Sequence, residues 1–135
     1  MNVWKIGSRW SDTGTRDSSV LDIFDKHQIV FAGREIEKIK SNVKVGDLIV
    51  IADGLKIVRV GQVISTPREI TTFTMFDADD KKRFDYNDNN IGFRVIIFKL
   101  SEDEIFDTKM GTFHRIKKDM GKVEKLFNDK ILTSS

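Results

Sequence analysis

The sequence predicts an α+β fold, in which a small curled sheet or β-barrel of five or six strands carries short peripheral helices. The main observation is a hairpin pattern in 45–65: a buried run over 48–52, the turn-forming pair Asp53-Gly54, and a second apolar run over 57–64. Gly61 interrupts the second run, and a glycine within a strand indicates a bulge, a bend or a close backbone approach. The remaining apolar runs are short and do not alternate with helices, which argues against a parallel βαβ sheet. We expect the two runs of the hairpin to pair antiparallel and to bury Leu48, Val50, Val58 and Val60.

Before the hairpin, the pattern predicts a strand, a polar loop, a helix and a second strand. Residues 2–7 alternate as a strand does and lead into a polar loop over 8–17. A helix is expected from Ser18 or Ser19 to near His27, because Ser19 and Asp22 have the spacing of a capping box. Residues 29–32 then form a strand candidate stopped by Gly33, and 34–42 favours one or two helical turns.

After the hairpin, the alternation in 70–76 predicts a strand, and the polar segment 77–90 predicts an exposed loop or a distorted hairpin. Residues 92–100 form the clearest later strand, and 111–117 favours a last short strand or the start of a helix. A helical stripe follows, although Gly121 weakens that helix by about 1 kcal/mol relative to alanine. The stripe consists of Ile116, Met120, Val123 and Phe127.

Composition limits the functional classes more than it selects one. The 135 residues suit a single domain over 1–135, and 23 basic residues nearly balance 21 acidic ones. The absence of cysteine excludes disulfides and thiolate metal sites. No run approaches the roughly 20 apolar residues that span a bilayer, and no signal-peptide pattern is present. We therefore expect a cytoplasmic protein, and nothing in the sequence calls for a cofactor.

The opening VWKIGSRWSD…SSVLDIF, then IVFAG, then KVGDLIVIADG…IVRVGQVIS, resembles the PUA-like superfamily. Within it, the chain is similar to the EVE and YTH branch and to N-terminal domains of modification-dependent restriction systems. The resemblance covers residues 1–65, and its GDLI and GxV motifs are shared with ASCH and PUA relatives. It implies a compact barrel whose pocket accepts one nucleobase, often a modified one, held by aromatic side chains.

The resemblance also implies where such a base would bind. The matching positions lie in the first loop, at the end of the second strand and at the hairpin turn, namely Ser8, Arg9, Trp10, Phe31, Ala32, Gly33 and Asp53.

Each of these positions also has a purely structural interpretation. Trp10 would stack on a base, or it would be a satellite core residue that caps the barrel. Arg9 would clamp a phosphate or a base edge, or remain a solvated loop charge. Asp53 would accept from an exocyclic amine, but an Asp-Gly turn explains it more simply. Trp4, in the middle of a strand, is expected in the core.

Residues 109–130 carry seven basic and three acidic side chains. Opposite the apolar stripe they form a basic helix face, which is either solvated or in contact with phosphates through Arg115, Lys118 and Lys122. The polar stretch 85–96 resembles a calcium loop but has Asn90 and Ile96 where glycine and glutamate are required, so we reject it. His27 and His114 lack recognisable partners for catalysis or metal binding.

The sequence therefore favours a non-catalytic module that binds nucleic acid, DNA rather than RNA, and takes a flipped, modified base into a pocket beside the first loop. A nuclease or another effector protein is a candidate partner. An ASCH-like enzyme that processes RNA or nucleotides, and a protein-interaction scaffold, are the alternatives.

Overall fold

A computed structural model of the chain describes residues 1–10 and 18–134. The strands are β1 (Val3–Gly7), β2 (Arg9–Trp10), β3 (Ser18–Ser19), β4 (Ile29–Ala32), β5 (Leu48–Asp53), β6 (Lys56–Val63), β7 (Arg68–Glu69), β8 (Ile91–Lys99), β9 (Phe106–Asp107) and β10 (Phe113–Arg115). The helices are α1 (Leu21–His27), α2 (Ile36–Asn42), α3 (Ala78–Lys81) and α4 (Met120–Ser134), with 3-10 turns η1 (Ile70–Thr72) and η2 (Glu102–Glu104).

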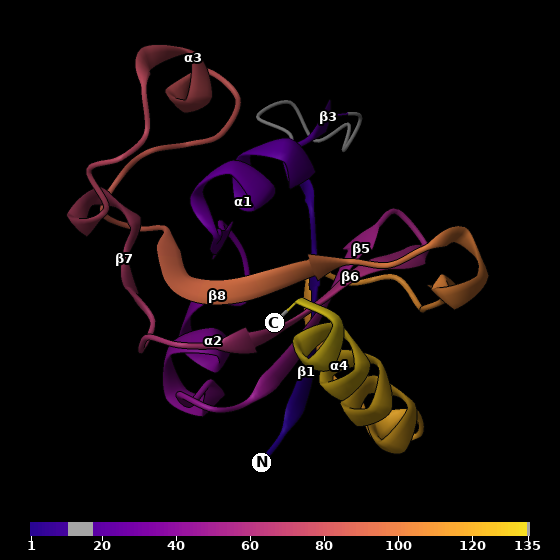
Figure 1. The fold of residues 1–135 in the computed structure, drawn as a ribbon. Helices are drawn as coiled ribbons and strands as arrows, with labels where there is room; N and C mark the ends of the chain where they lie inside the picture. The colour runs from indigo at the N-terminus through magenta and orange to yellow at the C-terminus, as the bar shows by residue number, and fades with distance from the viewer. Residues whose placement is uncertain (11–17, 135) are drawn as a thin grey trace.

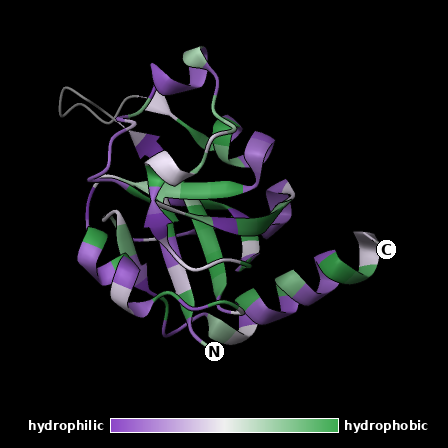
Figure 2. Ribbon diagram, turned by 90° about the vertical axis from the view of Figure 1, so that its left-hand side faces the viewer, coloured by the Kyte–Doolittle hydropathy of each residue, from purple (hydrophilic) through white to green (hydrophobic). Residues whose placement is uncertain are grey.

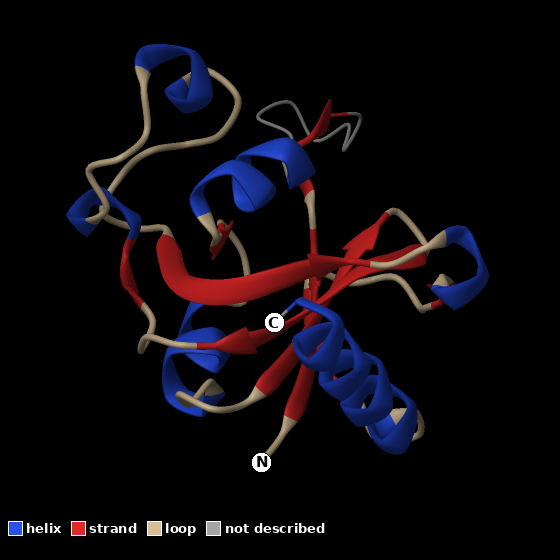
Figure 3. Ribbon diagram, viewed as in Figure 1, coloured by secondary structure: helices blue, strands red, loops and turns tan. Residues whose placement is uncertain are grey.

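The central feature is a strongly curled half-barrel sheet with the strand order β10-β1-β5-β6-β8-β4 (Figures 1 and 3). The strands β1 and β5 run parallel, whereas the other neighbours along this path are antiparallel. The long strand β8 bends so that it pairs with β6 over 95–99 and with β4 over 91–94. This arrangement is the predicted α+β fold.

The predicted hairpin is confirmed as β5 and β6, which pair antiparallel. Leu48, Val50 and Val60 are buried, but Val58 is only partly buried. The turn is one residue later than expected: Asp53 pairs with Lys56, and only Gly54 has a positive φ, of 64°. Between the pairs Ile51–Arg59 and Ala52–Ile57 the register shifts by one residue, which makes Val58 the extra residue of a bulge in β6 and places no bulge at Gly61.

Gly61 allows a close backbone approach, one of the three alternatives that its position in a strand suggested. A Cβ atom built at this position would lie 2.3 Å from the carbonyl oxygen of Ile96 on the neighbouring strand β8. That separation is far below van der Waals contact. Only glycine therefore allows β6 and β8 to pair as they do here.

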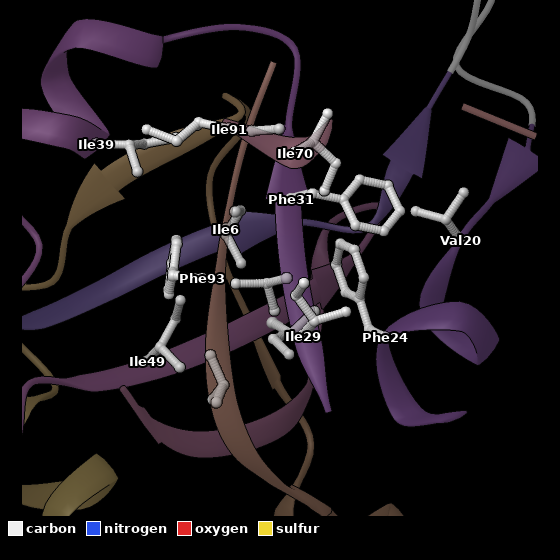
Figure 4. Packing of buried hydrophobic residues seen from close by; sticks show 14 of the residues in the cluster. Ile6, Val20, Phe24, Ile29, Phe31, Ile39, Ile49, Ile70, Ile91 and Phe93 are labelled. Atoms are coloured by element: carbon white, nitrogen blue, oxygen red, sulfur yellow. The ribbon is translucent and has the colours of Figure 1, made fainter. Parts of the chain in front are cut away.

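Two hydrophobic cores lie on opposite faces of the sheet. Alternate residues of β5 contribute to each, with Ile49 and Ile51 in one and Leu48, Val50 and Ala52 in the other. The barrel core contains α1, α2 and β4, and Figure 4 shows its isoleucine and phenylalanine side chains meeting. The helix-side core is covered by α4 (Figure 1). This two-sided burial explains the unbroken apolar run of β5.

The helix α4 uses the predicted stripe: Val123 and Phe127 are buried, and Ile116 and Met120 pack against the same core. Figure 2 shows polar and apolar residues alternating along α4, while the central strands are mostly apolar. The segment 111–117 forms the short strand β10 rather than the start of a helix. Among the described residues, no helix is long and apolar enough to cross a membrane.

Two local predictions are wrong. The N-cap of α1 is Val20 without a side-chain cap; Ser19 Oγ instead accepts from the backbone N–H of Leu21. The segment 70–76 is not a strand but begins with η1. Ile70, Phe73 and Phe76 are its buried residues. These buried residues are three positions apart, whereas the strand prediction was based on an alternation with a period of two.

Candidate nucleic-acid interface

A cavity of about 770 Å³ opens where β1 and β4 end, and segment 81–90 forms its third wall. We call it the Trp10 cavity. Its lining is Gly7, Arg9, Trp10, Phe31, Ala32, Gly33, Arg34, Lys81, Phe84, Asp85, Tyr86, Asn90 and Thr112. Five of the seven residues expected to bind a base lie in this lining. The structure thus brings together the first loop and the end of the second predicted strand.

Trp10 lies on the wall of this cavity and is partly exposed. The short strand β2 carries it, and pairing of Trp10 with Ser18 of β3 fixes that strand. The indole meets Phe31 and Phe84 edge-on, with ring centroids 5.8 and 6.1 Å apart. These contacts hold the ring in place at the cavity wall. Trp10 thus belongs both to the cavity and to an aromatic cluster beneath it.

The floor of the cavity consists of aromatic side chains, and some of them were not among the predicted site residues. Phe31 is buried and lies 4.2 Å from Phe84, centroid to centroid, at a tilt of 34°. Phe76 and Tyr86 complete the cluster at 5.0 and 6.2 Å from Phe84. Phe84 and Tyr86 come from the polar stretch that was expected to be an exposed loop or a distorted hairpin, and Phe76 comes from the segment that was expected to be a strand. The only signal in the sequence was the presence of isolated aromatics among acidic and basic residues.

Segment 77–90 is anchored to α1 through Asp80, which is only 6% exposed. Asp80 accepts from His27 at 2.9 Å and from Lys26 at 3.3 Å, and it forms a capping box with Asp77 at the start of α3. Burial raises the pKa of Asp80, but the hydrogen bonds from His27, the Asp77 backbone and Lys26 outweigh it and hold the pKa below its usual value. The carboxylate is therefore a fixed anchor for the third wall.

A second anchor is Arg83, which donates to both oxygens of Asp22 at 2.6 and 2.8 Å and to the Ser19 carbonyl. The hydrogen bond from Arg83 is the main reason why the pKa of Asp22 is lowered. Tyr86 donates to the carbonyl of Phe73 at 2.7 Å, which fixes the far end of the wall. The unpredicted wall is thus tied down at several points.

Ser8 and Asp53 lie outside the lining of the Trp10 cavity. Ser8 is buried and its hydroxyl donates to the Ala52 carbonyl at 2.8 Å, so it holds β1 against β5. Asp53 accepts from Arg9 at 2.9 Å, and both side chains are partly exposed. Ser8 and Arg9 also line a smaller neighbouring cavity of about 220 Å³, beside Lys5. Asp53 therefore acts on the Trp10 cavity only through the position of Arg9.

Positive charge surrounds the mouth of the Trp10 cavity. Arg9, Arg34 and Lys81 are cationic, and among the described residues of the lining Asp85 is the one carboxylate. Lys81 Nζ lies 4.5 Å from the centroid of the Tyr86 ring, a cation–π contact. This excess of cations over an aromatic floor suits a ligand with a flat ring and a nearby anionic group.

The predicted phosphate contacts lie elsewhere. Arg115 lies on β10, where it pairs with Trp4 of β1. It is three residues beyond Thr112, which lines the cavity, so the two residues are roughly 10 Å apart along the strand. Lys122 lies on α4, with Nζ 4.0 Å from the centroid of the Phe106 ring. Lys118 is exposed just before α4. The structure does not bring this basic group to the Trp10 cavity, because α4 covers the opposite face of the sheet.

Within residues 1–10 and 18–134, no cluster of three or more metal-ligating side chains is found. His27 contacts Asp80 as described. His114 lies on β10 opposite Lys5, and its pKa is lowered to about 4 by burial and by the charges of Lys5, Lys109 and Lys38. His114 is therefore neutral at pH 7.

Comparisons with known proteins give a likeness in fold. A scan against family models finds no match for this chain, and a search of curated proteins finds no significant relative. Among solved structures, the chain is similar to ASCH from Zymomonas mobilis, with a TM-score of 0.51 and 10% identity. The match covers 93% of this chain and 94% of that chain. The curled half-barrel with its four helices is thus a PUA-like fold.

Proposed function

We propose that this chain is a non-catalytic nucleic-acid-binding module that takes one base into the Trp10 cavity. The observation that carries the proposal is Trp10 itself, a partly exposed indole over an aromatic floor, with Arg9, Arg34 and Lys81 around it. Stacking of a base on an aromatic ring contributes about 1–3 kcal/mol and tolerates any base. The cations suit the phosphates on either side of that base.

The size of the cavity agrees with this role. Ligand sites commonly measure about 300–1,000 Å³, and the Trp10 cavity of about 770 Å³ falls within that range. A base in a duplex must first leave its stack, at a cost of a few kcal/mol that contacts in the cavity must offset. We further propose, from the resemblance to the EVE and YTH branch, that the base is modified and that the nucleic acid is DNA.

The basic group formed by Arg115, Lys118 and Lys122 is a separate part of the proposal. Because Lys122 lies on α4 and Lys118 just before it, on the face of the sheet opposite the barrel core, they would contact phosphates only of a strand that continues around the molecule. Short oligonucleotides should therefore bind without it.

The test is a binding panel measured by fluorescence anisotropy. Short labelled oligonucleotides that differ in one central base, unmodified or modified, are titrated with the full chain. We expect one class of base to bind more tightly than the others, and Trp10→Ala to lose about 1–3 kcal/mol of that affinity. Equal binding of every strand by the wild type and by Trp10→Ala would contradict the proposal.

The motifs that the sequence shares with ASCH relatives give one second candidate, an enzyme that processes RNA or nucleotides, and the likeness in fold is compatible with both candidates. The same panel, extended to RNA strands, is incubated with the chain and the products are separated by size and by nucleoside composition. Intact strands support the binding module. Cleaved strands or altered nucleosides, lost in Trp10→Ala, would instead support the enzyme.

A further inference from the structure

Asn90 is a buried amide on the inner wall of the Trp10 cavity. It is 7% exposed and lies immediately before β8. Its backbone is held on both sides, because its N–H donates to the Asn87 carbonyl at 3.1 Å and its carbonyl accepts from the N–H of Ile70 at 2.9 Å. The side chain therefore starts from a fixed position.

The orientation of the amide follows from its one side-chain hydrogen bond. Nδ2 of Asn90 donates to the carbonyl oxygen of Asp85. Because a carbonyl oxygen only accepts, Nδ2 must face Asp85 and Oδ1 must face away from it. No described residue donates a hydrogen bond to this Oδ1 atom. An acceptor is thus held in place on the cavity wall.

That acceptor lies beside Trp10. Measured from a Cβ position built on Gly33, Asn90 Oδ1 is 3.3 Å away and Trp10 Cη2 is 2.6 Å away. Both groups therefore converge on the backbone at Gly33. A flat ring stacked against the indole would present one of its edges to Asn90 Oδ1.

We propose that Asn90 Oδ1 selects a base whose edge carries an exocyclic amino group with at least one N–H. Adenine, cytosine and their N-monomethyl derivatives belong to this class. The inference rests on the proposed base-binding function. A buried acceptor that loses its donor carries an uncompensated desolvation cost, so a base without that N–H is rejected. The cations at the mouth cannot replace Oδ1, because Arg9, Arg34 and Lys81 only donate.

The test uses ligands that differ in this one group. Oligothymidine strands carry a single central adenine, N6-methyladenine, N6,N6-dimethyladenine or purine, and a second set carries cytosine or pyrimidin-2-one. Dissociation constants for the wild-type chain are measured by anisotropy. We expect at least one amino-bearing base to bind about tenfold or more tightly than its partner that lacks the N–H, which corresponds to about 1.4 kcal/mol.

The variant Asn90→Ala is measured on the same strands, and its thermal unfolding is followed to confirm that it is folded. We expect the ratio between the paired strands to fall to near one. If Asn90→Ala does not fold, the wild-type ratios between the dimethyl and monomethyl strands, and between the purine and adenine strands, still test the proposal, because ratios near one would overturn it.

The possible outcomes distinguish selection by Asn90 from the proposed base-binding function on which it rests. Tight binding with equal constants for the paired strands would leave the base-binding module standing and overturn the selection by Asn90. Persistent selection in folded Asn90→Ala would assign it to another residue. No binding of any modified or unmodified strand, in this set or the wider panel, would overturn both.

Discussion

Trp10 lies against Gly33 so closely that a Cβ atom at position 33 would come within 2.6 Å of Cη2 and 3.0 Å of Cζ2 of the indole. The place of this ring on the cavity wall thus depends on the absence of a side chain at the end of β4. The atoms that a methyl group would meet most closely belong to the tip of the Trp10 side chain, which is able to move, and Asn90 Oδ1 follows at 3.3 Å.

We therefore expect Gly33→Ala to displace the indole while the fold persists. The variant should bind its preferred oligonucleotide about tenfold more weakly, with little change in melting temperature. The matched control is Gly7→Ala, also in the cavity lining, where a Cβ atom meets nothing closer than 3.9 Å. Equal affinities for Gly33→Ala and the wild type would show that the position of Trp10 is unimportant for binding.

Alanine substitutions at two other glycines, Gly61 and Gly121, test the close pairing of β6 with β8. In Gly61→Ala the new methyl group would meet the Ile96 carbonyl at 2.3 Å and Val95 Cγ1 at 2.7 Å, and this backbone cannot yield without breaking the pairing of β6 with β8. We expect a loss of about 3 kcal/mol or more in the free energy of unfolding. Gly121→Ala, where the space is open, should be neutral or gain up to about 1 kcal/mol. Urea titrations measure both, and a mild effect at position 61 would disprove the close approach.

Much of the fold was predictable because it depends on local patterns. The run 48–52 is apolar throughout because both faces of β5 are buried, and the stripe of α4 has a clear helical period. The turn position was less predictable: the hairpin moved by one residue because Val58, an extra residue of β6 opposite Ile51 and Ala52, changes the register.

Only part of the candidate site could be predicted from the sequence. The resemblance stated from the sequence pointed to the first loop and the end of β4, but the third wall comes from 81–90, beyond the reach of that resemblance. Polar composition suggested exposure there, yet Phe84 is 2% exposed because anchors at Asp80 and Arg83 hold the segment over the barrel core. Such long-range contacts leave no periodic trace in a sequence.

Asp47 is a buried structural carboxylate immediately before β5. It is 4% exposed and accepts from Trp4 Nε1 at 2.9 Å and from the backbone N–H groups of Asn2 and Lys44 at 3.1 and 3.0 Å. Asp47→Ala leaves these donors without their acceptor, and we expect a loss of about 2–4 kcal/mol of stability. Asp53→Ala, which removes the exposed ion pair with Arg9, should cost about 1 kcal/mol or less. Chemical denaturation of the two variants checks the contrast, and similar losses would contradict it.

His114 makes stability depend on pH with a definite sign. Its pKa is lowered to about 4 in the folded chain by burial and then by the charges of Lys5, Lys109 and Lys38. The unfolded chain has a value near 6.5, so between these two pH values the unfolded state binds a proton that the folded state does not. Stability is therefore fully present above about pH 6.5 and is lost as the pH falls toward 4.

We expect His114→Gln to abolish this component, which we place at about 1–2 kcal/mol because the ring is only partly buried. The measurement compares free energies of unfolding for the wild type and the variant from neutral to acid pH. The two curves should converge as the pH falls, because only the wild type loses this component. Parallel curves would show that burial does not perturb His114.

Contact between Trp10 and the bound base can be followed directly through the fluorescence of Trp10 during an oligonucleotide titration. The chain has two tryptophans, and Trp4 is buried against Phe113, so Trp4→Phe leaves Trp10 as the single reporter. We predict that the preferred oligonucleotide quenches this emission with the same dissociation constant that anisotropy gives, while Trp10→Phe, which retains Trp4, shows no quenching. Binding by anisotropy without any change in Trp10 emission would contradict the account, because a base stacked on the indole must quench it.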